Sequence, residues 1–233
     1  MKSIRALTFD LDNTLWETDL SILKAEDAMA AHLRRLSPPD WMAEFSLNTF
    51  RAVRQQIVEE QPTIAHNLTV VRCETLIRWF ENQGATKSIA EELASEGFRM
   101  FYEERQKVEP YPDTIETLEI LAKIYPLAAI TNGNADLMAM PLGQYFQFSL
   151  QSQHFPKPKP DPVMFEEALK RLAIQPNECL HIGDDIEHDV MGASRLGIRT
   201  VWFNTRAQVL DDDVPADHTI TNLKQLLNIL KSP

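Results

Sequence analysis

Four short apolar runs, each ending in polar or acidic residues, recur along this 233-residue chain: Ala6–Asp12, Leu127–Asn132, Cys179–Asp185 and Ile198–Asn204. An apolar run of this length with polar boundaries is typical of a buried strand. Segments with helical periodicity separate the runs, and one of them, Pro162–Leu172, starts at a helix-compatible Asp-Pro pair. Strand and helix in alternation predict an α/β fold: a Rossmann-like, three-layer core in which a parallel sheet carries helices on both faces. Such sheets bind ligands beyond the carboxyl ends of their strands, where the polar residues of this chain fall.

From residue 17 to residue 107 the alternation stops, and only helical patterns are present. Apolar residues recur at helical spacing in three stretches: Ile22, Ala25, Met29, Leu33 and Leu36; Leu68, Val71, Thr75, Leu76 and Trp79; and Ile89, Leu93 and Met100. The pattern predicts a helical domain over 17–107, inserted into a core made of 1–16 and 108–233. Because the insert directly follows the first strand, we expect it to cover the strand ends as a lid. We expect its aromatic residues to fill its interior: Trp41, Trp79, Phe80 and Phe98.

The chain is acidic, with 23 Lys and Arg against 34 Asp and Glu and a formal net charge of −11. No basic run interrupts this acidity, so we expect no nucleic-acid partner. The two cysteines, Cys73 and Cys179, are too few for a disulfide framework and are expected to be reduced. The first 16 residues lack the pattern of a signal peptide, and no apolar stretch has the length of a bilayer span. We therefore expect a cytoplasmic protein with no membrane partner.

The first run ends in two acids, Asp10 and Asp12. Carboxylates two residues apart on a strand share a face, and both reach one small volume where the backbone turns at the strand end. A calcium-binding loop also opens with Asp-x-Asp, but Leu15 stands where that loop needs Gly, and Ser21 where it needs Glu. Two solvated acids in a turn are the structural alternative. The apolar strand that runs directly into the pair favours a functional site.

The second run ends with Thr131, Asn132 and Gly133, which offer a hydroxyl, an amide and backbone N–H groups to an anionic oxygen. The same tripeptide is also common in ordinary turns. Lys157 and Lys159 then follow in a segment stiffened by prolines, for which a solvated linker is the structural alternative. Each of these signals is weak by itself, and together they predict a site for an anion.

The third run ends with Asp184 and Asp185, and Asp189 follows about one helical turn later. Acids packed at a strand end repel one another unless a cation neutralises them, so the cluster predicts a metal ion or a lysine nearby. A solvated acidic turn is the structural alternative. Taken with the first two motifs, these acids complete a coherent site for phosphoryl transfer.

The order and spacing of these motifs resemble the haloacid dehalogenase (HAD) superfamily over the whole chain. The resemblance rests on Asp10-Leu11-Asp12-Asn13-Thr14, on Thr131-Asn132, on Lys159 in Lys-Pro-Asp-Pro, and on Gly183-Asp184-Asp185 with Asp189. It implies the HAD fold, with the helical insert as a C1 cap. It also implies a Mg²⁺-dependent phosphomonoester hydrolase that forms an aspartyl-phosphate and takes a small-molecule phosphate ester as its partner.

The resemblance implies catalytic roles for the acids. Asp10 is expected to be the nucleophile, and Asp12 to protonate the leaving alkoxide and later deprotonate the attacking water. Asp10, the carbonyl of Asp12 and Asp184 are expected to hold Mg²⁺.

The resemblance also implies binding roles for the second and third motifs. Thr131 and Lys159 are expected to stabilise the phosphoryl oxygens as catalytic groups, with Asn132 as a further substrate-binding residue. Asp185 and Asp189 are expected to support these groups without contacting the substrate, with Asp189 orienting Lys159 or a water molecule at the metal.

The local sequence around the first two motifs is most similar to that of bacterial flavin mononucleotide (FMN) phosphatases. The segments that carry this similarity are Leu7-Thr8-Phe9-Asp10-Leu11-Asp12 and Ala129-Ile130-Thr131-Asn132-Gly133-Asn134-Ala135. Members of that type also dephosphorylate the riboflavin precursor 5-amino-6-(5-phosphoribitylamino)uracil.

A phosphatase for nucleotides or sugar phosphates is an alternative. Haloacid dehalogenases share the fold but lack the acid at the position of Asp12, because a halide needs no proton. A phospho-acceptor signalling module of receiver type combines similar residues but has no insert of this size after its first strand.

Arg72 interrupts the end of an apolar run in the segment Asn67–Arg72, where a helix is predicted to begin. A buried arginine needs an anionic or polar partner, and we consider both a substrate phosphate and an adjacent carboxylate for that role. Similar FMN phosphatases have an arginine in a comparable helix, which makes Arg72 a candidate for substrate binding; a solvated helix face is the structural alternative. We expect a monomer or a weak homodimer.

Overall fold

The computed structural model describes residues 3–205 and 216–231 of the chain. The chain divides into two compact units, Met1–Glu17 with Glu109–Pro233, and Thr18–Val108. We refer to them as the core unit and the helical insert. Each joint lies one residue further along the chain than the sequence pattern predicted, so Glu17 belongs to the core unit and Val108 to the insert.

The core unit is built on a six-stranded sheet with the order β3-β2-β1-β4-β5-β6, and all neighbouring strands are parallel. The strands are β1 (Ala6–Phe9), β2 (Leu127–Thr131), β3 (Phe148–Gln151), β4 (Cys179–Gly183), β5 (Arg199–Phe203) and β6 (His218–Ile220). The four apolar runs form β1, β2, β4 and β5, and the predicted α/β fold is confirmed. The edge strands β3 and β6 were not expected from the sequence. Both are short and keep part of their side chains exposed, so neither forms a continuous apolar run.

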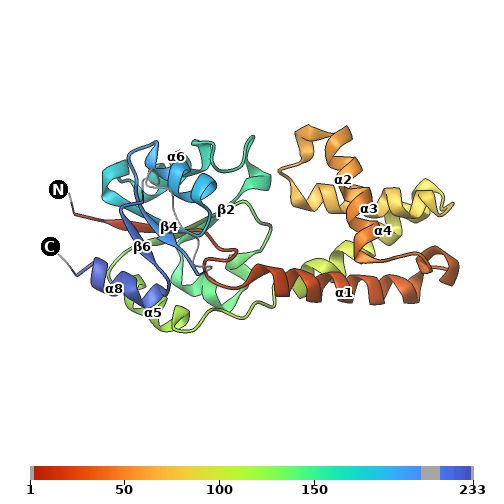
Figure 1. The fold of residues 1–233 in the computed structure, drawn as a ribbon, viewed down its shortest axis with the longest axis horizontal. Helices are drawn as coiled ribbons and strands as arrows, with labels where there is room; N and C mark the ends of the chain where they lie inside the picture. The colour runs from red at the N-terminus through yellow and green to blue at the C-terminus, as the bar shows by residue number, and fades with distance from the viewer. Residues whose placement is uncertain (1–2, 206–215, 232–233) are drawn as a thin grey trace. The chain divides into compact units, whose positions relative to one another are not determined.

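Helices lie on both sides of this sheet (Figure 1). Helix α6 (Val163–Leu172) lies on one side, while α5 (Thr114–Ala122) and α8 (Leu226–Ile229) lie on the other. A buried cluster packs α6 against the sheet, and it includes Phe165 and Leu169 from the helix with Ile130 and Cys179 from the strands. The remaining helical segments are short: η3 (Leu137–Ala139), η4 (Pro141–Tyr145), η5 (Ser152–His154), η6 (Pro176–Glu178), the π-helical turn η7 (Ile186–Met191), α7 (Gly192–Ser194) and η8 (Leu223–Gln225).

The helical insert contains four long helices and no strand, and all of its residues are described. They are α1 (Thr18–Leu36), α2 (Leu47–Glu60), α3 (Leu68–Asn82) and α4 (Lys87–Arg105), with the short turns η1 (Pro39–Met42) and η2 (Pro62–Ile64). Trp79 and Phe80 are buried in its core, and Trp41 and Phe98 pack against that core, as the sequence predicted. The predicted stripes are shorter than expected, since Leu36 and Ile89 near helix ends are exposed. No helix in the described part of the chain is long and apolar enough to span a bilayer.

The strand order determines where the functional residues meet. β1 lies between β2 and β4, and Phe9 is in register with Ala129 on one neighbour and Ile182 on the other. From β1 the chain builds β2 and β3 on one side, then crosses to β4 on the other side, so β1 lies at a topological switch point. The loops that follow β1, β2 and β4 therefore gather at one edge of the sheet.

Candidate active site

The loop after β1 places Asp10 at the centre of this edge. Asp10 is buried, its N–H donates to the carbonyl of Ile182 at 2.8 Å, and its Oδ2 accepts the hydroxyl of Thr14 at 3.2 Å. Asn13 has a φ of 60°, a left-handed conformation that asparagine tolerates better than most residues. The loop therefore turns back at once, which brings Thr14 beneath the carboxylate that precedes it by four residues.

Lys159 enters the same volume from the segment before α6. The side chain is 2% exposed, and its Nζ donates to Asp10 Oδ1 at 2.8 Å and to Asp189 Oδ1. The amide of Asn132 fixes its backbone, because Asn132 Oδ1 accepts the Lys159 N–H at 2.8 Å and Nδ2 donates to the Lys159 carbonyl at 2.9 Å. Two loops that are 27 residues apart in sequence are thus joined directly behind the lysine.

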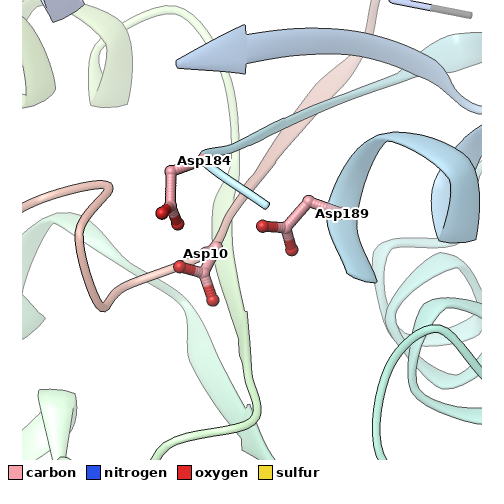
Figure 2. A group of neighbouring side chains, drawn as sticks. All are labelled: Asp10, Asp184 and Asp189. Carbon is pink, nitrogen blue, oxygen red and sulfur yellow. The ribbon is translucent and has the colours of Figure 1, made fainter. Parts of the chain in front are cut away.

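Three carboxylates converge near this ammonium. Figure 2 shows the side chains of Asp10, Asp184 and Asp189 directed toward a common volume, and an oxygen of each lies within 4.8 Å of the others. Asp189 is occupied by the protein: Lys159 and His181 share its Oδ1, and the N–H of Asp185 donates to its Oδ2 at 3.1 Å. Asp10 and Asp184 are therefore the two carboxylates best placed to hold a metal ion, with the hydroxyl of Thr14 3.3 Å from Asp184 Oδ1.

The electrostatics of the group favour a divalent cation. Burial raises the pKa of Asp10 well above its usual range although Lys159 opposes the shift, and burial with the adjacent Asp189 raises the pKa of Asp184 to about 7. Burial also acts on Asp189, but the charge of Lys159 and the hydrogen bond from His181 outweigh it and hold its pKa well below the usual range. Although burial lowers the pKa of Lys159, the two carboxylates raise it above its ordinary value. When all three carboxylates are ionised, the single ammonium leaves two negative charges without a partner, and hard oxygen ligands of this kind suit Mg²⁺.

Asp12 lies beside this group and has its own support. The indole N–H of Trp16, which is fully buried, donates to Asp12 Oδ1 at 3.0 Å. A Cβ at Gly133 would collide with Asp12 Oδ2, so only glycine lets the loop after β2 approach this carboxylate so closely. The sequence predicted Asp12 and Gly133 in the same site but gave no indication that the two would touch.

The structure brings together most of the residues that the sequence singled out. Thr131 is buried at the end of β2, and its Oγ1 accepts the Gly133 N–H at 2.9 Å. Asn132 was expected to bind substrate, and in the structure its amide holds the backbone of Lys159. Asp185 is half exposed and caps the turn η7 by accepting the N–H of His188 at 2.8 Å. Lys157, the alternative lysine, is exposed and pairs with an acid of its own segment.

Arg72 belongs to the helical insert and has a carboxylate partner there. Both of its terminal nitrogens donate to Glu26 Oε1 at 3.2 Å, and its guanidinium carbon lies 3.6 Å from the ring centroid of Phe101. Burial lowers the pKa of Arg72 to about 10, against the opposing effect of Glu26, so the group remains charged at neutral pH. The adjacent carboxylate is thus one of the two partners considered from the sequence, and a role in substrate binding stays a prediction.

Three site residues carried no assigned role in the sequence analysis: Thr14, Trp16 and His181. All three are buried, and each donates or accepts a hydrogen bond with a functional carboxylate. Thr14 and Trp16 fall in or just after the first motif, so their proximity to it was a usable signal. His181 was visible only as a titratable residue inside an otherwise apolar strand.

Comparison with known proteins identifies the family. A model of haloacid dehalogenase-like hydrolases matches residues 4–197. The chain belongs to this family. The match favours this family over the receiver-type module considered from the sequence.

Several curated relatives of this HAD hydrolase are phosphatases, and one from Burkholderia cepacia, 26% identical over 235 residues, is named an (S)-2-haloacid dehalogenase. A 5-amino-6-(5-phospho-D-ribitylamino)uracil phosphatase from Escherichia coli K12 is 34% identical over 200 residues, which cover 86% of this chain and 83% of the relative. A glyceraldehyde 3-phosphate phosphatase from Methanopyrus kandleri is 27% identical over 239 residues, which cover 98% of this chain and 97% of the relative. The chain is thus a phosphatase-type enzyme of the HAD family.

Among solved structures, a protein described as 2-haloacid dehalogenase from Pseudomonas syringae pv. Tomato DC3000 is 36% identical, with a TM-score of 0.91 and coverage of 97% of this chain and 98% of the other. Its description names a different reaction from that of the two phosphatases above. The choice between the two reactions therefore depends on the residues of this chain.

Proposed function

We propose that this HAD hydrolase is a Mg²⁺-dependent phosphomonoesterase that forms an aspartyl-phosphate on Asp10. The observation that carries the proposal is the buried contact of Asp10 with Lys159 beside a second acid, Asp184, whose charge the lysine does not neutralise. A carboxylate nucleophile that must approach a phosphate dianion needs more positive charge than one ammonium supplies.

The reaction has two steps, and Asp12 gives up a proton in the first and takes one back in the second. An oxygen of Asp10 attacks phosphorus, the P–O bond to the alcohol breaks, and Asp12 gives its proton to the departing oxygen. Water then attacks the phosphorus of the aspartyl-phosphate, Asp12 takes the proton of that water, and phosphate leaves with the Asp10 carboxylate restored. Trp16 donates to one oxygen of Asp12, which holds this carboxyl group while it gains and loses its proton.

The other residues orient and neutralise the phosphoryl group. Asp10 and Asp184 would hold Mg²⁺, which supplies charge neutralisation of the phosphoryl oxygens when bound. Thr131 Oγ1 accepts the Gly133 N–H, so its own proton can be donated to a phosphoryl oxygen. Lys159 adds a second donor that Asn132 holds in place through the backbone.

We propose that the substrate is a small phosphorylated metabolite, and that the riboflavin precursor named in the Escherichia coli relative and FMN are the first compounds to test. The 34% identity over most of both chains supports the first of these substrates. FMN is suggested only by the local sequence around the first two motifs.

Dehalogenation of a 2-haloacid is the second candidate, because the structure with 36% identity is described as a 2-haloacid dehalogenase. In that reaction Asp10 would displace a halide, which needs neither a proton from Asp12 nor a metal ion. The acid at Asp12 and the two uncompensated negative charges therefore favour the phosphatase.

A paired assay decides between these reactions. The wild-type protein is supplied with p-nitrophenyl phosphate, FMN and the riboflavin precursor phosphate in Mg²⁺ or in EDTA, and in parallel with 2-chloropropionate while chloride is measured. We expect Mg²⁺-dependent phosphate release, and we expect Asp10→Asn to lower it by at least about 10³-fold because the nucleophile is lost. Glu119→Gln, which removes an exposed acid of α5, serves as the control and should leave turnover unchanged. Chloride release without phosphate release would replace the proposal with the dehalogenase.

A further inference from the structure

We infer that His181 is a positioning residue of this site, which fixes the carboxylate of Asp189 and, through it, the ammonium of Lys159. The inference rests on the proposed function and deepens it. His181 lies in the middle of β4, is 1% exposed, and belongs to none of the motifs on which the family resemblance rests. Its ring contacts Asp189, the carboxylate that pairs with Lys159, and buried polar groups are kept where they make such hydrogen bonds.

A continuous chain of hydrogen bonds carries the inference. Its inner part runs from His181 Nε2 to Asp189 Oδ1 at 3.2 Å, and from that oxygen to Lys159 Nζ, which in turn donates to Asp10 Oδ1 at 2.8 Å. Its outer part joins His181 Nδ1 to Thr8 Oγ1 at 2.9 Å. Every residue in this chain is buried, so water competes little for these bonds.

The direction of the bonds follows from what each group can donate. The ionised carboxylate of Asp189 only accepts, so the proton of His181 is on Nε2. Burial lowers the pKa of His181 despite the opposing effect of Asp189, so the ring is neutral and its Nδ1 accepts the hydroxyl proton of Thr8. The thiol of Cys179 lies 3.6 Å from Thr8 Oγ1, and burial raises its pKa to about 12, so it keeps its proton and can donate to that oxygen. The chain therefore has one consistent polarity, which fixes the tautomer of the imidazole.

This arrangement controls where Asp189 points. Its Oδ1 takes the histidine and the lysine together, while its Oδ2 takes the N–H of Asp185, next to the candidate metal ligand Asp184. One carboxylate thus sets the position of the phosphate-binding lysine relative to the metal-binding loop. Without the donor from His181, the Asp189 carboxylate is held only by Lys159 and by the N–H of Asp185, so the position of Lys159 relative to Asp10 is less strictly fixed.

Close packing on β4 and on α6 surrounds the side chains of His181 and Asp189. A Cβ at Gly183 would collide with the Asp189 carboxyl group, so the side chain packs directly on the β4 backbone two residues beyond His181. On its other side, the His181 ring meets the edge of Phe165, with centroids 5.1 Å apart. Phe165 packs against the histidine without taking part in the hydrogen bonds, which makes it a matched control.

Three variants test the inference. His181→Leu removes the donor, His181→Gln keeps an amide N–H at a similar distance from the backbone, and Phe165→Leu removes packing on the same ring. For each variant, kcat and KM for a phosphate ester, the Kd of inorganic phosphate in Mg²⁺ and the free energy of unfolding are measured. We expect His181→Leu to lower kcat about 10–100-fold and to weaken phosphate binding, as is typical for residues that orient a functional group. His181→Gln should recover most of both, and Phe165→Leu should lose stability while kcat is kept.

The outcomes separate this inference from the proposed function. An active wild type with His181→Gln no better than His181→Leu, or with Phe165→Leu equally slow, overturns the positioning role while the phosphatase stands. A wild type that neither hydrolyses phosphate esters nor binds phosphate overturns both.

Discussion

At the scale of single residues, the site distinguishes carboxylates by their hydrogen-bond donors. Asp189 has three donors and is the carboxylate that Lys159 neutralises, whereas Asp10 and Asp184 have fewer and a raised pKa. The same side chain therefore serves as a fixed structural anion at one position and as a nucleophile or metal ligand at the others. Local donors, rather than residue type, set these roles.

The two lysines of the proline-rich segment give the first prediction. Lys159→Ala should lower kcat/KM for phosphate esters by at least about 10²-fold, because a donor to the developing charge is lost. Lys157→Ala is the control, since this exposed side chain pairs with Asp161 at 3.3 Å, from Nζ to Oδ2, and it should leave kcat/KM nearly unchanged. Steady-state kinetics of both variants check the assignment, and a larger loss for Lys157→Ala would contradict it.

Asp12 and Trp16 give a second prediction. Because an alkoxide needs a proton and nitrophenolate does not, Asp12→Asn should slow alkyl phosphates more than p-nitrophenyl phosphate. Trp16→Phe removes the N–H that holds Asp12, together with part of a buried ring, so it should show the same leaving-group dependence with a smaller loss, about 3–10-fold for a single hydrogen bond. Kinetics with a series of leaving groups measure the effect, and equal losses on all substrates would argue against the acid role.

Arg72 gives a third prediction, on stability. Arg72→Ala should lower the free energy of unfolding by about 3 kcal/mol, because it leaves the buried Glu26 without its main partner. Arg51→Ala removes a half-exposed partner of the same carboxylate and should cost at most about 1 kcal/mol. Urea unfolding compares the two variants. If Arg72 also binds substrate, the folded Arg72→Ala protein will have a lower kcat/KM for FMN than the Arg51→Ala protein.

At the scale of secondary-structure elements, the central strands were predictable and the connections were not. Each central strand is buried on both faces and therefore appears as a continuous apolar run. Asp10, Thr131 and Asp184 could be identified because they lie at the carboxyl ends of these runs, where such sheets bind ligands. The partner of Asn132 was not predictable, since its contact with Lys159 depends on how two distant loops pack. His181 was missed for the same reason: its partners come from β1 and η7, and no spacing within β4 reveals them.

The end of α6 gives a prediction at this scale. Ala173 terminates the helix with a φ of 53°, a left-handed conformation in which its Cβ is unfavourable, and its side chain is exposed. Ala173→Gly should therefore raise the free energy of unfolding by about 0.5–1 kcal/mol, because glycine adopts this conformation without strain. Ala173→Val is the opposite control and should destabilise the protein. Denaturant unfolding with unchanged kcat would check both, and a destabilised Ala173→Gly would contradict the argument.

At the scale of the whole molecule, the acidic cluster links stability, pH and metal binding. The pKa of Asp184 is about 7 in the folded protein and 3.8 for an isolated aspartate. Because folding raises this pKa, the folded state without metal loses stability as the pH rises from 3.8 to about 7. A metal ion needs the ionised carboxylate, so its affinity should rise over the same interval.

This linkage predicts a pH-dependent effect of Mg²⁺ on Tm. The increase in Tm on adding Mg²⁺ should be small at pH 5.5 and large at pH 8, and binding near pH 6 should release protons that calorimetry in buffers of different ionisation enthalpy detects. Asp184→Asn should abolish both effects, whereas Asp185→Asn, which alters the half-exposed neighbour, should retain most of them. An equal Tm increase at both pH values in the wild type would contradict the assignment of the metal site.

The chain leaves and re-enters the core unit at adjacent positions. Trp16 forms a bridge with Pro110, and the N–H of Tyr111 donates to the carbonyl of Leu15 at 2.9 Å, so two points more than 90 positions apart in the sequence are direct neighbours. A segment whose two ends meet in this way can be exchanged for another without altering the register of any strand. In evolutionary terms, this junction allows the intervening domain to be replaced while the sheet and the residues at its strand ends are kept.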